Sequence, residues 1–97
     1  MANYIILGNF TDQGIRNVKE TTKRADAVRS MAEKVGATIK DIYWTLGSFD
    51  IVAVLDAPDD ETATALGLSI GTLGNIRTQT LRAFTADEIG NILGKVD

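Results

Sequence analysis

The chain alternates between short apolar runs and longer segments in which apolar residues recur at every third or fourth position. Short runs bounded by glycine, proline or polar turn residues are typical of strands. Four such runs predict strands over Tyr4–Phe10, Ala37–Leu46, Phe49–Ala57 and Asn75–Phe84. The longer spacing predicts helices from about Gly14 to Val35 and from about Asp60 to Ile70, and a last short helix is expected from Thr85 or Ala86 to about Leu93.

Turn and capping residues support this division. Gly47 and Ser48 are suited to a tight hairpin between the second and third strands. Asp59 is placed to cap the second helix, and the acids that follow, Asp60 and Glu61, suit the positive end of a helix better than a metal site.

The order of elements is β-α-β-β-α-β with a helical tail, which is the ferredoxin-like arrangement of the α+β class. Its antiparallel sheet usually has the second and fourth strands at the edges. Because the chain has 97 residues, no linker and no internal repeat, we expect a single domain over residues 1–97.

Both predicted central strands are apolar on both faces. In the first strand Tyr4 and Ile6 share one face, and Ile5 and Leu7 share the other. In the third strand Val52 and Val54 lie opposite the face that carries Phe49, Ile51, Ala53 and Leu55. Helices on one side of a sheet normally leave a polar second face. We therefore expect a second copy to cover it, so that the chain forms a homodimer or larger oligomer packed sheet on sheet.

Composition excludes several kinds of chemistry. The chain has no cysteine and no histidine, which excludes the usual zinc site, an axial haem histidine, a thiolate nucleophile and a Ser-His-Asp triad. No apolar run reaches the length needed to cross a bilayer, and the first residues do not have the pattern of a signal peptide. We expect a cytoplasmic protein without a metal, a cofactor or a membrane partner, and leave open whether it is an enzyme.

Basic residues are concentrated in the first predicted helix. Six basic and three acidic residues lie between Ile15 and Val35, although the net charge of the chain is −3. Such a helix can bind nucleic acid. The interspersed acids favour a solvated face instead, since Glu20 can pair with Lys23 or Arg24 at helical spacing. Nucleic acid therefore ranks behind other partners.

The fourth predicted strand is unusually polar. Thr78, Thr80 and Arg82 alternate onto one face, where they could form a row of donors for a small anion. The alternative is an edge strand that polar residues protect against open-ended pairing, with arginine paired to an acid such as Asp50 or Asp56.

Two further residues complete the candidate site. Trp44 is suited to the core, to a dimer interface or to stacking on a planar ligand. Asp50 is suited either to anchoring the hairpin or to acting as a general base near Trp44. The predicted ligand-binding residues are thus Trp44, Asp50, Thr78, Thr80 and Arg82, and Asp50 is the one catalytic candidate.

The segments "YWTLGSFDIVAVLDAPDDETATAL" and "GNIRTQTLRAF" resemble the GYD domain family of small bacterial and archaeal proteins, and the resemblance spans almost the whole chain. The glycine, aromatic residue and aspartate that name the family fall on Gly47, Phe49 and Asp50, with Phe49 where tyrosine is common. The resemblance implies a ferredoxin-like fold of the dimeric α/β barrel type, and it implies no defined activity.

Two functions are compatible with these features. The first is an oligomeric protein that binds a small anionic or aromatic ligand between sheet and helices or at the dimer seam. Its catalytic form would be a cofactor-free enzyme with Asp50 as base and Arg82 as anion holder. The second is an assembly module whose polar strand only specifies subunit packing.

Overall fold

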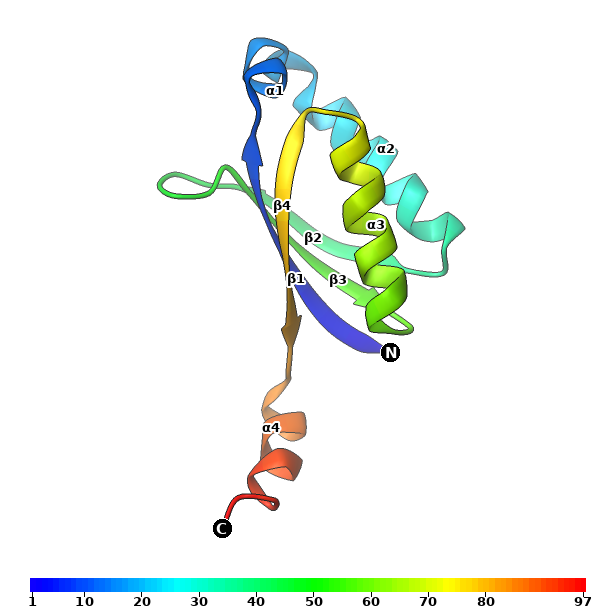
Figure 1. Cartoon of the computed structure of the whole chain (residues 1–97), viewed down its shortest axis with the longest axis vertical. Coiled ribbons are helices and arrows are strands. Elements are labelled where there is room, and N and C mark those ends of the chain that lie inside the picture. Colours follow the sequence, from blue (N-terminus) through cyan, green and yellow to red (C-terminus); the bar gives the residue numbers. More distant parts are fainter.

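The computed structural model describes residues 1–97. Its four strands form one antiparallel sheet in the order β2-β3-β1-β4, and helices α2 and α3 lie together on one side of it (Figure 1). This confirms the predicted α+β, ferredoxin-like fold, with the second and fourth strands at the edges. The elements are β1 (Ala2–Phe10), α1 (Asp12–Arg16), the 3-10 helix η1 (Val18–Glu20), α2 (Thr21–Lys34), β2 (Thr38–Trp44), β3 (Ile51–Ala57), α3 (Asp60–Thr72), β4 (Ile76–Ala83) and α4 (Ala86–Leu93).

The prediction of one continuous first helix is wrong. The chain forms α1, turns at Asn17 and passes through η1 before α2 begins. The carbonyls of Gly14 and Asn17 accept hydrogen bonds from the side chain of Arg24, and the Asn17 carbonyl also accepts from the Glu20 N–H within η1. Ile15, which lies near the start of the predicted continuous helix, is 53% exposed.

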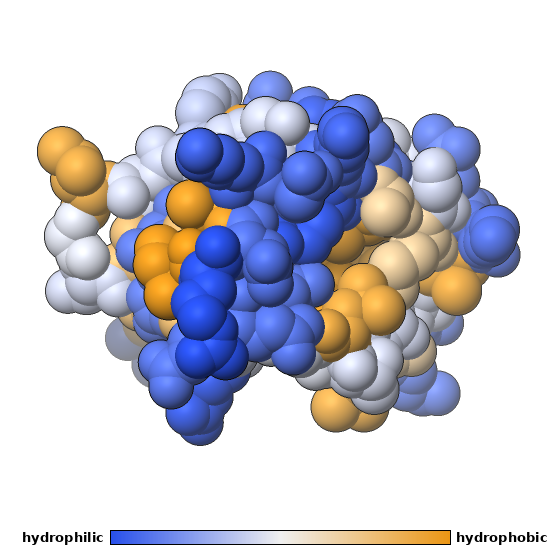
Figure 2. All heavy atoms as spheres, turned by 90° about the horizontal axis from the view of Figure 1, so that it is seen from above, coloured by the Kyte–Doolittle hydropathy of each residue, from blue (hydrophilic) through white to orange (hydrophobic).

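The prediction of a tight hairpin at Gly47 and Ser48 is also wrong, because β2 already ends at Trp44 and β3 begins only at Ile51. A loop over residues 45–50 joins β2 to β3, with Gly47 at a φ of 103°. The loop projects from the sheet, at the left of Figure 1, and carries a fully exposed Leu46. Figure 2 shows hydrophobic atoms at this projecting end and a second apolar patch beside it, and a hydrophilic band separates both from the apolar patches on the opposite side.

The core lies between the sheet and the pair α2 and α3. Alternate residues of β1 and β3 are buried there, and Leu55 of β3 and Leu66 of α3 are the largest fully buried side chains of this core. This alternation follows from the period of two in a strand, which sends every second side chain to the same face. The predicted helix cap also forms, because the Asp59 side chain accepts from the backbone N–H of Thr62.

The opposite sheet face remains open. Ile5, Leu7, Val52 and Val54 are only half-buried there, and the helices α2 and α3 lie on the other side (Figure 1). Registers place Ile5 beside Val54 and Leu7 beside Val52, so these four side chains form one continuous apolar surface. The two apolar faces expected from the sequence are therefore present, and only one is covered within the chain.

The last helix stands away from the rest of the chain at the bottom of Figure 1. A capping box begins α4: the Thr85 hydroxyl accepts from the Glu88 N–H, and the Glu88 carboxylate accepts from the Thr85 N–H. Its apolar residues Ile89 and Leu93 are exposed. No helix in the structure has the length and apolar character to span a membrane.

Candidate functional site

The predicted row of polar side chains on β4 exists. Thr78, Thr80 and Arg82 pair in register with Gly8, Ile6 and Tyr4 of β1, and so project to the side of the sheet that carries the helices. Two shallow hollows, of about 170 and about 210 Å³, lie between this strand and α3, and Thr80 lines both.

Gly67 of α3 keeps the first hollow open. A Cβ at this position would lie 3.3 Å from the Thr80 hydroxyl oxygen and 3.7 Å from that of Thr78. The missing side chain thus leaves both hydroxyls accessible from the helix side.

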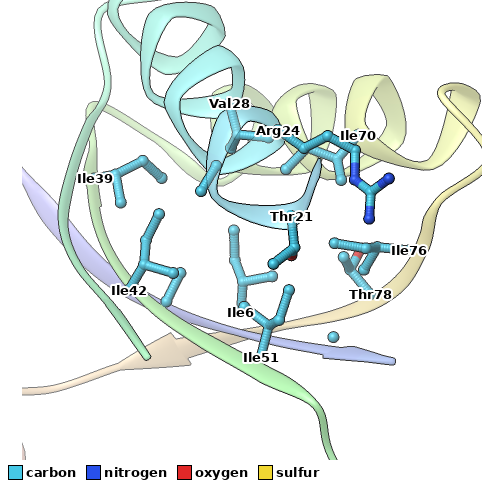
Figure 3. Close-up of a pocket in the computed structure, with 13 residues that line it drawn as sticks. Ile6, Thr21, Arg24, Val28, Ile39, Ile42, Ile51, Ile70, Ile76 and Thr78 are labelled. Carbon is cyan, nitrogen blue, oxygen red and sulfur yellow. The ribbon is translucent and has the colours of Figure 1, made fainter. Parts of the chain in front are cut away.

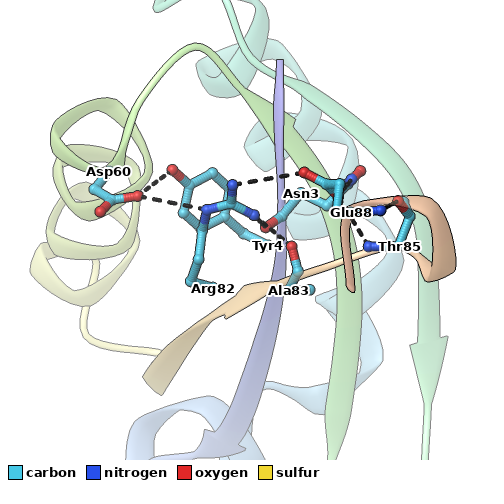
Figure 4. Close-up of polar contacts among 7 residues, drawn as sticks. All are labelled: Asn3, Tyr4, Asp60, Arg82, Ala83, Thr85 and Glu88. Atoms are coloured by element: carbon cyan, nitrogen blue, oxygen red, sulfur yellow. Dashed lines mark hydrogen bonds and ion pairs between the residues drawn. The ribbon is translucent and has the colours of Figure 1, made fainter. Parts of the chain in front are cut away.

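Arg82 is occupied by acidic partners (Figure 4). Its Nε lies 3.9 Å from Asp60 Oδ1, and its Nη2 lies 3.8 Å from Glu88 Oε2. The guanidinium also sits 4.6 Å from the centre of the Phe84 ring. Two carboxylates offset one cation, so Arg82 connects α3, β4 and α4 in the way the edge-strand alternative predicted. The prediction that Asp50 or Asp56 pairs with an arginine of this strand is wrong. Asp56 pairs with Lys40, and Asp50 accepts from the Phe10 N–H.

Tyr4 belongs to the same cluster. Its hydroxyl donates to Asp60 Oδ1 over 2.5 Å, and this hydrogen bond, together with burial, raises the pKa of Tyr4 to about 12. The backbone N–H of Thr85 lowers the pKa of the Glu88 carboxyl. Both shifts move away from neutrality, so these two groups hold fixed protonation states near pH 7 and are not suited to exchanging protons there.

Asp50 lies at the other end of β1. Its Oδ2 accepts from the backbone N–H of Phe10 over 2.9 Å, and its own N–H donates to the carbonyl of Gly8. Phe10 is six residues along β1 from Tyr4, which is opposite Arg82, so about 20 Å separates the two ends at the usual rise of a strand. Asp50 and Arg82 therefore do not meet within one chain.

Trp44 faces the helices from the other edge of the sheet. Its Nε1 donates to the Thr21 hydroxyl over 3.0 Å, which joins β2 to the first turn of α2. The ring is 44% exposed. Thr21 also lines a cavity that extends across the sheet, and Thr78 lines the same cavity from the opposite edge. Trp44 therefore lies at the border of this cavity, through its contact with Thr21.

This cavity lies between the sheet and the helices (Figure 3). It measures about 60 Å³, and its polar side chains are Thr21, Arg24 and Thr78. Aliphatic residues make up the rest of its walls, among them six isoleucines: Ile6, Ile39, Ile42, Ile51, Ile70 and Ile76.

Arg24 is the residue that sequence reasoning missed. The charge pattern predicts a solvated basic face for it, whereas its Nη1 donates to the carbonyl of Asn17 over 3.0 Å and its Nη2 to that of Gly14 over 3.2 Å. Its Nε is buried without an acceptor. A signal was present: Arg24 lies beside Ala25 and one turn before Val28, on the apolar stripe of the helix. The expected pair of Glu20 with Lys23 does form, at 3.4 Å.

The chain matches the GYD domain family over residues 4–93. A relative from Thermus thermophilus, named glutamine synthetase and cystathionine beta-lyase binding protein, is 28% identical over 90 residues, which cover 92% of this chain and 95% of the relative. A crystal structure of a protein from Thermus thermophilus is similar with a TM-score of 0.58 and 23% identity, covering 89% of this chain and 96% of that one. The structural likeness supports the ferredoxin-like fold.

Proposed function

This chain belongs to the GYD domain family, and we propose that it is an interaction module that works as a homodimer and binds metabolic enzymes. The name of its relative describes a protein that binds two such enzymes, glutamine synthetase and cystathionine beta-lyase. The observation that carries the proposal is the open, apolar face of the sheet.

That face has the composition of a protein interface. Its centre is formed by Ile5, Leu7, Val52 and Val54, and it continues on the edge strands with Tyr43 and Leu81, which are 57% and 44% exposed. Contiguous apolar surface of this kind on a soluble protein marks a binding site. Polar side chains surround the centre, as the rim of an interface requires.

A second copy of the chain is the occupant that the charges favour. Arg77 lies exposed at the β4 edge of this face and Asp41 at the β2 edge. In a twofold pairing that sets β4 of one copy against β2 of its partner, Asp41 lies level with Leu81, four residues along β4 from Arg77, so the opposite charges attract across about 13 Å without forming a direct ion pair. Each copy would repeat the arrangement, because a twofold interface uses the same surface twice.

A small polar ligand between β4 and α3 is the second candidate. The hollows lined by Thr78 and Thr80 support it. The two carboxylates beside Arg82 disfavour an anion at that end, so an uncharged hydrogen-bonding ligand suits the hollows better than the anion expected from the sequence. The hypothesis of a cofactor-free enzyme has less support still, because Asp50 as base and Arg82 as anion holder lie at opposite ends of β1.

Light scattering coupled to size exclusion tests the dimer. Leu81→Lys places a charge on the open face at a position already exposed in the single chain, so the monomer should tolerate it while the dimer should not. We expect wild type at the mass of two chains and Leu81→Lys at the mass of one. Ser30→Lys, which adds the same charge on exposed α2, should stay dimeric. A monomeric wild type would contradict the homodimer.

Binding to purified enzymes tests the interaction function separately. The full chain is immobilised, and glutamine synthetase and cystathionine beta-lyase from its own source are passed over it in an interferometer. We expect saturable binding of at least one enzyme by wild type and Ser30→Lys. If neither enzyme binds to a confirmed dimer, the enzyme-binding function is wrong. If Leu81→Lys loses enzyme binding while wild type is a monomer, the open face binds the enzyme directly.

A further inference from the structure

We propose that the outer edge of β4 binds an extended segment of a partner protein, which adds to the sheet as a fifth strand. The proposal rests on the interaction function proposed above and identifies the kind of segment that is bound. β4 is an edge strand and lies beside α3 (Figure 1). A second copy stacked on the open face would cover the face of the sheet and not this edge, so the two surfaces can be occupied together.

The first argument is the unpaired backbone of this edge. The Thr11 N–H donates to the Asn75 carbonyl, and these two residues stand in the same register as the pairs of β1 with β4. In an antiparallel ladder every second pair is hydrogen-bonded, so the odd-numbered residues of β4 direct their N–H and C=O toward β1. The even-numbered residues direct theirs away from the sheet, among them Thr78, Thr80 and Arg82. No backbone hydrogen bond of the turns, loops and caps involves these three residues.

The second argument is the spacing of the two hollows between β4 and α3. Thr78 and Thr80 line the first hollow, and Thr80 and Arg82 line the second, so the hollows follow one another along the strand about two residues apart. A strand added to the edge would direct every second side chain to this side of the sheet, at the same spacing. Two successive side chains on that side would therefore enter the two hollows, as in other complexes formed by strand addition.

The first hollow suits a small apolar side chain. Leu68 of α3 lines it and is 68% exposed, so most of its surface has no partner within the chain. Gly67 leaves the space between the helix and the hydroxyls of Thr78 and Thr80 open. A valine on an added strand would fill this space and cover part of Leu68.

The second hollow suits a basic side chain. Asp60 and Arg82 line it, and Glu88 lies 3.8 Å from Arg82 (Figure 4). Two carboxylates and one guanidinium give this cluster a net charge of −1. The Asp60 side chain is 80% exposed, and its contacts with Tyr4 and Arg82 both use Oδ1, so Oδ2 is available to an ammonium group. A lysine from the partner would bring the charge of the cluster to zero.

These preferences define the partner segment. All strand pairs of the sheet are antiparallel, and a strand added in the same sense would place lysine opposite Thr80 and valine, two positions later, opposite Thr78. The polar side chains of the edge disfavour pairing with an entirely apolar strand. β4 of a second copy suits the edge less well, because Arg82, the basic residue on this side of β4, is already paired with acids of its own chain.

The synthetic peptide acetyl-Thr-Thr-Lys-Thr-Val-Thr-Thr-amide tests the site in the full-length protein by isothermal titration and by NMR. We expect saturable binding, with slower amide hydrogen exchange at Thr78, Thr80 and Arg82 in the complex. Exchange at Gln79 and Leu81, which already pair with β1, should change little. No saturable binding, or binding without slower exchange at the three outward amides, would overturn the proposal.

Modified peptides separate backbone pairing from other modes of binding. Methylation of the backbone nitrogens of lysine and valine blocks the N–H groups that would face β4, and it should weaken binding at least about tenfold. Methylation of the two threonine nitrogens that flank lysine, which would face solvent, should change affinity by at most about twofold. Glutamate in place of lysine should weaken binding about tenfold or more. Equal affinity of the two methylated peptides would refute strand addition.

Thr80→Pro tests the edge from the side of the protein. Proline removes an N–H that points away from the sheet, so the ladder with β1 should remain and the peptide should bind at least about tenfold more weakly. Leu81→Lys, which changes the open face, should bind the peptide as wild type does. Should Thr80→Pro fail to fold, the pair of methylated peptides still decides the question with the wild-type protein.

The enzymes named above separate this proposal from the proposed function. We expect an enzyme that binds wild type to bind Thr80→Pro at least about tenfold more weakly. Equal binding of the enzyme to both proteins would leave the interaction function intact and refute the edge of β4 as its site. If the peptide slows exchange at the outward amides but neither enzyme binds, the edge site stands and the assignment of enzymes as partners is wrong.

Discussion

The two ends of β1 are both rich in polar contacts, but the contacts are of different kinds. At the Phe10 end the polar groups reach backbone atoms, as when the Asp50 carboxylate accepts from the Phe10 N–H. At the Tyr4 end the contacts mostly join side chains to one another around Arg82, which also donates to the carbonyls of Asn3 and Ala83. The difference decides how much each end constrains the fold.

The Phe10 end is a closely fitted corner. The Thr11 N–H donates to the Asn75 carbonyl over 3.1 Å, and the Thr11 hydroxyl donates to the carbonyl of Gly74. A Cβ on Gly14 would lie only 2.0 Å from the Asn75 oxygen. Gly74 itself has a φ of 82°, a conformation that glycine adopts without strain. The backbone between α3 and β4 is thereby held against the start of α1.

The Tyr4 end is a solvent-facing cluster. The Asp60 side chain is 80% exposed, and those of Arg82 and Glu88 are about one-third exposed. Water and salt screen ion pairs in such positions, so each contributes little to stability. Arg82, the residue that draws attention in the sequence of the polar strand, therefore lies in the region where substitutions should cost less stability. Substitutions should cost more at the corner around Gly14 and Gly74.

The largest effect is expected for Gly14→Ala. The new methyl group would collide with the backbone oxygen of Asn75, which cannot move without breaking its hydrogen bond to the Thr11 N–H. We expect a loss of about 3 kcal/mol or more in the free energy of unfolding, measured with urea. Gly71→Ala is the matched control, because Gly71 is an exposed position of α3 where an added Cβ contacts nothing. It should raise the free energy of unfolding by at most about 1 kcal/mol. Equal stability of the two variants would contradict the fitted corner.

Asp50→Ala should have the next largest effect. It removes the acceptor of the half-buried Phe10 N–H, and the loss of one such hydrogen bond to a charged group costs about 1.5–3 kcal/mol. Asp50→Asn keeps an oxygen that can accept and should recover part of this loss. Urea unfolding of both variants measures it. If alanine and asparagine destabilise equally, the hydrogen bond to Phe10 is not the reason that Asp50 matters.

These two positions show what sequence patterns can and cannot predict here. The elements and the row of Thr78, Thr80 and Arg82 followed from periodicity, because side-chain direction in a strand or helix is set locally. The strand order followed from the usual arrangement of β-α-β-β-α-β chains, and the Asp59 cap from the residue type before the helix. The partners of Arg82 and Asp50 depend on which loops and helix starts meet in space. Asp60 and Glu88 are 22 and 6 residues from Arg82 in sequence, and no local spacing links all three.

The cavity escaped prediction for a related reason. Arg24 stands in a run of basic residues, and only the break in the helix at Asn17 turns it toward backbone carbonyls. Just before the break, Gly14 lies close to the backbone of Asn75, which is 61 residues away in sequence. A candidate site that needs such long-range contacts cannot be predicted from charge spacing.

A smaller effect is expected at the other end of β1. Arg82→Met removes both ion pairs and keeps most of the apolar contact with Phe84. We expect a loss of about 1 kcal/mol or less at low salt, and a smaller difference from wild type in high salt, where ion pairs are screened. Urea unfolding at two sodium chloride concentrations measures both. A loss as large as that of Gly14→Ala, unaffected by salt, would reverse the ranking of the two ends.

The smallest effect at neutral pH is expected for Tyr4→Phe. The phenol donates to Asp60, whose exposed carboxylate can exchange this partner for water. The pH dependence of this contact appears only at high pH. Folding raises the Tyr4 pKa from 10.0 to about 12, so the neutral phenol is favoured in the folded state. Its stabilising contribution is complete below pH 10 and is lost as the pH rises through about 12.

Thermal unfolding between pH 8 and pH 12 checks this sign. Wild type should lose stability steadily above pH 10, and Tyr4→Phe should lose less over the same interval because it has no phenol at this position to ionise. Tyr43→Phe is the matched control: it removes a phenol from the open face and leaves the Tyr4 pair intact, so the alkaline loss that Tyr4 causes should remain. If the stability of the two variants depends on pH in the same way, the hydrogen bond from Tyr4 to Asp60 does not raise the Tyr4 pKa. The cluster around Arg82 would then constrain the fold even less than its geometry indicates.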